Sequence, residues 1–257
     1  MCGRVVVYSP PSVIAGSIGA RSLVADSELP PSWNIAPTRL LPVLYTDQVS
    51  RELLLDLCVW GFRPAWVGED SKRPRQPSRL DRGDVTGRAV QSGPVLFNAR
   101  LETAAVKAAF KEAFRSSRCL VAVDGFYEWH LENGTRQPYF FCRPDRGPIW
   151  LAGLWEPPPL QQAGLAELAR RRGTCTILTR PAQGAVATVH DRMPVIVSKP
   201  ARMPWLDPSS RDPAHLRKVI GESEETVLER LRVSRLVNQI SNDSPELIAA
   251  DCSDAVS

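Results

Sequence analysis

The sequence predicts an α+β fold with a mainly antiparallel, barrel-like β-sheet core and peripheral helices. Short runs of β-branched and aromatic residues recur along the chain and outnumber the helical patterns. Strands and helices also do not alternate, as they would in a parallel α/β fold. The 23 prolines outnumber the 16 glycines, which favours short elements separated by turns over long helices.

The expected strands are eight apolar runs bounded by Pro, Gly and charged clusters. They are residues 40–45, 53–60, 119–123, 139–142, 149–154, 174–179, 194–198 and 233–237. One amphipathic helix is expected within residues 101–115, because apolar side chains recur there at i, i+3, i+4, i+7 and i+8 from Val106. A second helical stretch is expected over residues 214–231, with an interruption near Gly221.

The length of 257 residues allows one large domain or two small ones, and no internal repeat is found. We expect a single domain over residues 1–250, with a long mobile loop at 68–92 and a frayed acidic tail at 251–257. The loop lacks apolar periodicity. The chain from Ser241 onward holds four acidic residues and neither Lys nor Arg.

Composition places the chain among globular proteins, since 43% of residues are hydrophobic and 23% are charged. The net charge of +4 is concentrated in residues 72–88, where six Lys or Arg residues stand against two Asp residues. This basic segment is interpreted as a solvated loop or as a surface that attracts nucleic acid.

No run approaches the roughly 18 apolar residues that cross a bilayer, and residues 5–8 are too short for a signal sequence. We therefore expect a cytoplasmic protein without a membrane partner. Six dispersed cysteines with no C-x-x-C pair, together with only three histidines, favour neither a disulfide framework nor structural zinc. No metal or other cofactor is expected.

Cys2 is the residue with the most specific chemistry. Removal of Met1 would leave it with a free α-amine and a thiol on adjacent carbons. At neutral pH, modest tuning of these two groups would supply an uncharged amine and a thiolate together. Such a 1,2-aminothiol condenses with an aldehyde to a Schiff base, and the sulfur then closes a thiazolidine ring. Taken alone, Cys2 is equally a small buried residue at the start of a first strand.

Other polar residues stand where predicted strands end. Asn98 and Arg100 precede the first predicted helix, and Glu128 is flanked by aromatic residues that would desolvate it and raise its pKa. His190 precedes an Asp-Arg pair and carries the side chain best suited to proton transfer at neutral pH. Singly, each is also a loop amide, a surface carboxylate or a core histidine. His130 and His215 lack such surroundings and are interpreted as surface residues.

Eight motifs occur along nearly the whole chain in a fixed order. They are MCGR at 1–4, WNIAPT at 33–38, WGFRPAW at 60–66, FNARLET at 97–103, RCLVAVDGFYEW at 118–129, AGLWE at 152–156, VHDRMPVIV at 189–197 and VNQISNDSPEL at 237–247. Together they resemble the SOS response-associated peptidase (SRAP) family. This resemblance implies a sensor and shield of abasic sites that crosslinks to single-stranded DNA through its N-terminal cysteine.

The resemblance also assigns roles. Asn98 would orient the cysteine backbone and the sugar, Glu128 would shuttle protons during Schiff-base formation, and His190 would act as an acid toward the opening sugar ring. Self-removal of Met1, reversal of the crosslink and an abasic-site lyase activity by β-elimination are implied as well. The partner would be single-stranded DNA containing abasic sites, so that the protein would be nucleoid-associated when bound.

Five residues of the matched motifs are expected to contact DNA. Arg4 and Arg100 would bind phosphates beside the lesion, whereas Pro37, Trp60 and Trp66 would stack on or wedge between flanking bases. Either tryptophan could equally belong to the core.

Two other classes of protein remain open from the sequence. An N-terminal-nucleophile amidohydrolase also begins MCG, but the RGxDSxG-like stretch and the Gly-rich substrate loops of that class are missing here. A non-catalytic single-stranded DNA-binding module, in which Cys2 is structural, is the other alternative. Covalent capture of abasic DNA that depends on Cys2 would distinguish the first interpretation from both.

Overall fold

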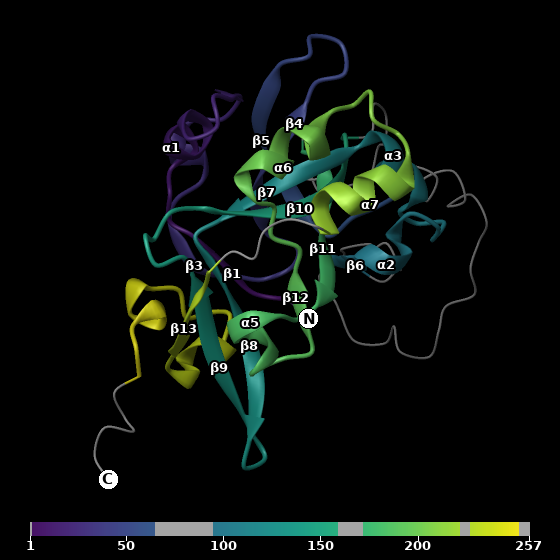
Figure 1. Ribbon diagram of the computed structural model, residues 1–257. Coiled ribbons are helices and arrows are strands. Elements are labelled where there is room, and N and C mark those ends of the chain that lie inside the picture. The colour runs from purple at the N-terminus through teal and green to yellow at the C-terminus, as the bar shows by residue number, and fades with distance from the viewer. Residues whose placement is uncertain (1, 65–94, 159–171, 222–226, 252–257) are drawn as a thin grey trace, which may run out of the picture.

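The computed structural model describes residues 2–64, 95–158, 172–221 and 227–251, which form two β-sheets with short helices around them (Figure 1). The first sheet is antiparallel, and its five strands follow the order β13-β9-β8-β1-β3. The strands are β1 (Val5–Val7), β3 (Ser32–Ile35), β8 (Gly125–Glu132), β9 (Thr135–Cys142) and β13 (Glu229–Arg232). The N-terminal strand β1 therefore lies inside the sheet, between β8 and β3.

The second sheet follows the order β12-β11-β10-β7-β4-β5-β2, and β6 also pairs with β11. A further parallel pairing of β11 with β5, through Thr174↔Val59 and Cys175↔Trp60, closes five of these strands into a ring. The strands of the second sheet are β2 (Arg21–Ser22), β4 (Leu40–Thr46), β5 (Leu53–Trp60), β6 (Asn98–Arg100), β7 (Arg118–Val123), β10 (Ile149–Glu156), β11 (Thr174–Pro181) and β12 (Arg192–Pro194). The predicted α+β, mainly antiparallel and barrel-like fold is thus confirmed.

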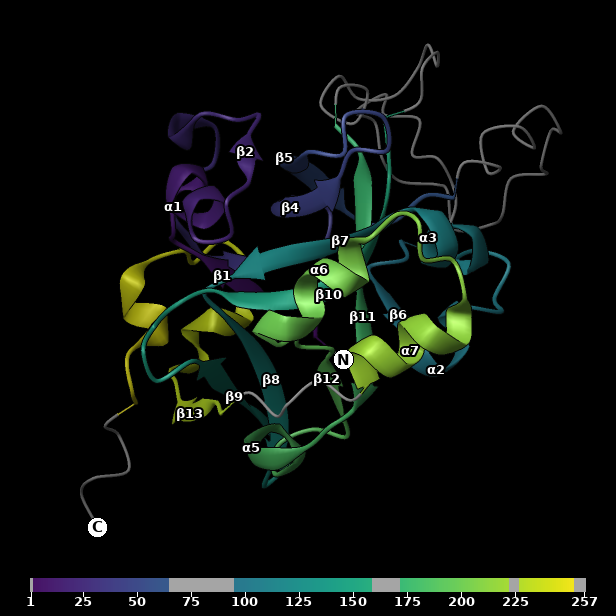
Figure 2. The ribbon, with the colours of Figure 1, turned by 45° about the horizontal axis from the view of Figure 1, so that its top comes forward.

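The helices are short and lie outside the sheets. In Figure 2, α6 and α7 lie on the near side of the second sheet, and α6 packs on β7. The helices are α1 (Pro11–Gly16), α2 (Leu101–Ala104), α3 (Lys111–Ser116), α5 (Gly184–Ala187), α6 (Lys199–Leu206) and α7 (Pro213–Gly221), and the 3-10 helices are η1 (Asp26–Glu28), η4 (Arg235–Asn238) and η5 (Pro245–Ile248). In the described part of the chain, every helix is too short or too polar to cross a lipid bilayer.

Both helix predictions need correction. The single helix predicted at 101–115 is divided into α2 and α3, and Val106, which the pattern assigns to the buried face, is 71% exposed. Phe110 and Phe114 are buried, as the apolar spacing predicts. In the segment between α2 and α3, however, tertiary packing overrides the local helix preference. In the second stretch, α7 covers Pro213–Gly221, in agreement with the interruption predicted near Gly221, but residues 229–231 belong to β13 and not to a helix.

Most of the predicted strands are present, with two exceptions near the C-terminal end. The run at 194–198 continues β12 only through an isolated bridge of Ile196 with Leu151. The run at 233–237 is not a strand, because it turns into η4 and places Val237 against the outer face of the first sheet. The loop predicted at 68–92 lies outside the described residues, as does the predicted tail beyond residue 251.

An apolar cluster that is separate from the main core covers the outer face of the first sheet. The C-terminal strap, residues 233–250, lies over the first sheet and is joined end to end by a bridge between Val233 and Ala250. The strap is anchored to β3 by Asp243, whose carboxylate accepts hydrogen bonds from Ser32 Oγ and the Trp33 backbone N–H. The buried members of the cluster are Val6, Tyr127, Phe140, Cys142, Val233, Val237 and Leu247.

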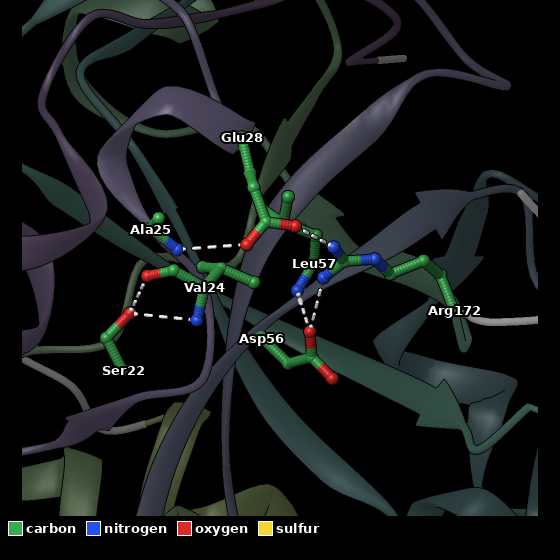
Figure 3. A network of polar contacts seen from close by, with 7 residues as sticks. All are labelled: Ser22, Val24, Ala25, Glu28, Asp56, Leu57 and Arg172. Atoms are coloured by element: carbon green, nitrogen blue, oxygen red, sulfur yellow. Dashed lines mark hydrogen bonds and ion pairs between the residues drawn. The ribbon is translucent and has the colours of Figure 1, made fainter.

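Elsewhere in the molecule, a polar network fixes η1 against β5 (Figure 3). Arg172 forms ion pairs with Glu28 and with Asp56, the latter at 2.8 Å. The Glu28 carboxylate also accepts a hydrogen bond from the backbone N–H of Ala25 at 3.0 Å. This network shares no residue with the predicted site, so we interpret it as structural.

Arg118 is a buried residue on which the stability of the fold is expected to depend. Its side chain is 5% exposed, and its guanidinium donates to five backbone carbonyls. These acceptors belong to Phe114, Arg115, Trp205, Asp207 and Ser210. Arg118→Met should lower the free energy of unfolding by about 3 kcal/mol, because buried carbonyls lose their donor. Urea unfolding measures this, and the exposed Arg115→Met is the control, expected within about 0.5 kcal/mol of the wild type.

Candidate active site

The four predicted catalytic residues come from four segments that are distant in sequence. Cys2 precedes β1, Asn98 begins β6, Glu128 lies in β8, and His190 lies between α5 and β12. The β1–β8 pairing, in which Val5 faces Phe126, carries the N-terminal segment past Glu128. β6 and β12 both pair with β11, which brings their ends to the same region.

The start of β8 is shaped by a glycine. A Cβ atom at Gly125 would lie 2.3 Å from the ring of Phe140, so that only glycine lets β8 approach β9 so closely. From there the strand proceeds through buried Phe126 and Tyr127 to Glu128, whose side chain is 2% exposed.

Direct contacts link these residues. Asn98 Nδ2 donates a hydrogen bond of 2.6 Å to the carbonyl oxygen of Cys2. The Nε2 atom of His190 lies 4.0 Å from Oε2 of Glu128. The negative charge of Glu128 also contributes, after burial, to raising the pKa of the Cys2 thiol. The structure therefore brings the four predicted residues together.

Burial determines the protonation states here. It raises the pKa of Glu128 to about 7, so that this carboxyl group exchanges protons near neutral pH. It lowers the pKa of His190, which keeps the ring neutral at physiological pH. It also raises the pKa of the Cys2 thiol. The expectation of a readily ionised thiolate is therefore wrong, because Cys2 is wholly buried and its thiol needs a neighbouring proton acceptor.

Two neighbours contact Nδ1 of His190. The backbone N–H of Arg192 donates to Nδ1 at 2.9 Å, which favours the neutral tautomer that carries its hydrogen on Nε2. Asp191 Oδ1 lies 2.8 Å from the same Nδ1, where it would stabilise the protonated ring. The donor Nε2–H then faces Glu128.

The residues expected to contact DNA have different environments. Arg4 is half-buried beside the Cys2 segment, Arg100 is exposed at the end of β6, and Pro37 is partly exposed after β3. Trp60 is 0% exposed, and its Nε1 donates to the carbonyl of Phe97 at 2.8 Å. The expectation that Trp60 stacks on bases is therefore corrected: its ring is part of the core. Trp66 lies outside the described residues, as does the basic segment at 72–88.

Two residues of the site are not predicted from the sequence. Trp129, next to Glu128, is partly exposed. Its ring is therefore accessible for stacking, whereas the buried ring of Trp60 is not. Arg192 donates to both carboxylate oxygens of Glu102, at 2.6 and 3.0 Å, and to the carbonyl of Thr179 at 2.7 Å. This contact ties β12 to α2, and thus holds the segments of His190 and Asn98 together. Trp129 lies in the same motif as Glu128, and Arg192 lies in the same motif as His190. This proximity in sequence is the signal that could have indicated them.

Within the described ranges, no group of three or more His, Cys, Asp or Glu side chains is arranged to hold a metal ion. The five described cysteines are unpaired thiols and are buried.

The fold and this site define a class of protein. The family model for SOS response associated peptidase (SRAP) matches residues 1–240, and the chain belongs to this family. It is 28% identical to the abasic site processing protein YoqW of Bacillus subtilis, over 96% of this chain and 99% of the relative. It is 27% identical to YedK of Escherichia coli, also named an abasic site processing protein, over 89% and 88% of the two chains. A crystal structure from Bacteroides thetaiotaomicron shares the fold, with a TM-score of 0.72 at 18% identity over 97% of this chain and all of that one.

Proposed function

We propose that this protein captures abasic sites in single-stranded DNA by forming a thiazolidine through Cys2 after Met1 has been removed. The convergence of Cys2, Asn98, Glu128 and His190 is the observation that carries the proposal. The names of the relatives, abasic site processing proteins, point to the same substrate. The protein would act in the cytoplasm, at the nucleoid.

The chemistry balances without a cofactor. The α-amine of Cys2 attacks the aldehyde carbon of the opened deoxyribose, and one water leaves as the imine forms. The sulfur then adds to the imine carbon and closes the five-membered ring, and the thiol proton ends on the nitrogen. An amide nitrogen cannot form this imine, so Met1 must first be removed.

The neighbouring side chains have separate tasks in this scheme. Glu128, with a pKa of about 7, protonates the leaving hydroxyl as the imine forms and later relays the thiol proton to the nitrogen. His190 stays neutral and presents Nε2–H to the ring oxygen of the sugar as it opens. Asn98 holds the Cys2 carbonyl and thereby the direction of the amine. If the imine instead loses a proton from the carbon next to the imine carbon, the phosphate on the following carbon leaves and the strand breaks, which is the proposed lyase activity.

Binding to DNA is assigned to the cationic and partly exposed residues beside this site. Arg4 and Arg100 would contact phosphates, and Pro37 and Trp129 would meet the flanking bases. Self-removal of Met1 would be the peptidase activity of this chain.

A denaturing gel tests the proposal. The purified protein is incubated with an oligonucleotide that contains one abasic site, and a band resistant to heat and denaturant is expected. Its intact mass should equal that of DNA plus a protein beginning at Cys2, minus one water. An oligonucleotide with a tetrahydrofuran spacer, which has no aldehyde, is the control and should give no band. A purified protein that crosslinks while still carrying Met1 would refute the thiazolidine.

The burial of Cys2 supports a second candidate, a non-catalytic single-stranded DNA-binding module in which Cys2 is structural. That module would bind the abasic and the spacer oligonucleotides equally and form no resistant band with either.

Strand preference and salt dependence form a further prediction. Crosslinking should be faster on single-stranded than on fully duplex DNA and independent of sequence, because the proposed contacts are phosphates and base faces. Noncovalent capture should weaken as salt rises, whereas the finished adduct should survive high salt. Gel time courses on matched single and duplex substrates measure both effects. Equal rates on the two substrates would contradict this assignment.

A further inference from the structure

A buried amide connects Arg4, which directly precedes β1, with the C-terminal strap. Asn34, in β3, is 4% exposed. Its Nδ2 donates to three carbonyl oxygens of the strap at 3.2, 3.0 and 2.7 Å, those of Val237, Gln239 and Asn242. Its Oδ1 accepts a hydrogen bond of 2.6 Å from Nη1 of Arg4.

The same contacts hold the guanidinium of Arg4. Its Nη1 also donates to the carbonyl of Val237 at 2.8 Å, and its Cζ lies 5.8 Å from the centroid of the Trp129 ring. The indole of Trp129 is itself held by the strap, because its Nε1 donates to Oδ1 of Asn238 at 2.6 Å. All of these partners are uncharged, so they fix the guanidinium without cancelling its positive charge.

We propose that Asn34 is a positioning residue for Arg4, and that through it the strap takes part in binding DNA. The inference rests on the proposed function, in which Arg4 contacts a phosphate beside the lesion. Asn34 is suited to this task because one amide supplies both an acceptor for Arg4 and donors for the strap carbonyls. Neither an apolar residue nor a carboxylate could do both.

The strap offers a matched control. Gln137, in β9, is also a buried amide, at 1% exposure, and its Nε2 donates to the strap carbonyl of Val233 at 2.8 Å. Its Oε1 accepts from Nε of Arg235 at 3.3 Å. Replacing Gln137 therefore removes a comparable buried amide that contacts the strap, and it leaves the Arg4 contacts described above in place.

The experiment measures noncovalent binding to a single-stranded oligonucleotide with a tetrahydrofuran spacer, over a range of salt concentrations. Asn34→Leu should weaken binding about tenfold, because a charge-assisted contact is no longer held in place. It should also reduce the slope of log affinity against log salt by about 0.7, as expected when one phosphate contact on a single strand is lost. Gln137→Leu should change neither value.

A double-mutant cycle separates positioning from stability. If Asn34 acts through Arg4, adding Asn34→Leu to Arg4→Gln should weaken binding no further than Arg4→Gln alone. Additive effects, or an equal loss in Gln137→Leu, would overturn the proposal. So would unchanged binding in Asn34→Leu when Arg4→Gln weakens it.

A second variant keeps the test valid if Asn34→Leu does not fold. Asn34→Asp has nearly the same size and places a carboxylate on Arg4, so the salt slope should fall by about 0.7 in this variant too. An unchanged slope in folded Asn34→Asp would overturn the proposal. Failure of the proposed function would appear in the wild type, which would then not crosslink abasic DNA, whereas failure of this inference would appear only in the variants.

Discussion

Cys2→Ala is expected to abolish the heat-stable adduct with abasic DNA and to leave noncovalent binding intact. Alanine keeps the α-amine but has no sulfur to close the ring, so an imine is the last species that can form. The denaturing gel measures the adduct, and binding to the spacer oligonucleotide measures the noncovalent step. The substitution removes only the sulfur atom of this wholly buried side chain, so the cavity is small and the surrounding strands should be disturbed little.

Cys2→Ser separates the two chemical steps. Its amine still forms a Schiff base, but the hydroxyl is a poorer nucleophile, so the adduct should be less stable and more imine should remain open to β-elimination. Borohydride should trap this imine as a stable adduct, and strand cleavage should rise without it. A heat-stable adduct in wild-type yield without reductant would contradict the assignment, because the sulfur would then have no role.

Glu128→Gln should slow adduct formation by a factor of about 100 to 10,000, the usual range for loss of a general acid-base group. The amide keeps the shape of the side chain but cannot take the thiol proton. The wild-type rate should also change with pH around 7, the pKa of Glu128, and this inflection should be absent from the variant. Crosslinking rates over a pH series on both sides of this value measure both effects. An inflection that persists in Glu128→Gln would assign it to another group.

The same substitution should stabilise the fold at alkaline pH. Folding raises the pKa of Glu128 from near 4.5 to about 7, so the folded state binds the proton more tightly. The resulting stabilisation is complete below pH 4.5 and is lost as pH rises through 7. At about pH 8, Glu128→Gln should therefore unfold with a free energy up to about 3 kcal/mol higher than the wild type. Urea unfolding at about pH 5 and about pH 8 tests this, and a larger gain at the acidic pH would contradict it.

The extent to which sequence predicts this fold depends on how local each signal is. Strands β4 and β5 are fully encoded in continuous apolar runs, and their predicted bounds agree closely with the structure. Strand β8 is absent from the expected strands because its polar outer half, from His130 onward, hides the pattern. The division between α2 and α3 depends on packing between distant segments, which no local period reports.

In the site, too, some residues can be predicted from the sequence and others only from the fold. The residue types at Cys2, Glu128 and His190 are informative because each has chemistry that few other side chains supply. Trp60 is misassigned because an indole is suited equally to a core and to a DNA surface, and only the fold decides between them. Asn34 cannot be found from sequence, since its partners in the strap are backbone carbonyls at sequence separations of 203, 205 and 208 residues.

The interior place of β1 has a consequence for the timing of biosynthesis. This strand needs β8 on one side and β3 on the other, and the site beside it also needs His190. A ribosome adding roughly 5 to 20 residues per second makes His190 on the order of 10 to 40 seconds after Cys2. During that interval the newly made cysteine lacks part of the surroundings described above. Aldehydes in the cell therefore meet a more accessible thiol on the growing chain than on the finished protein.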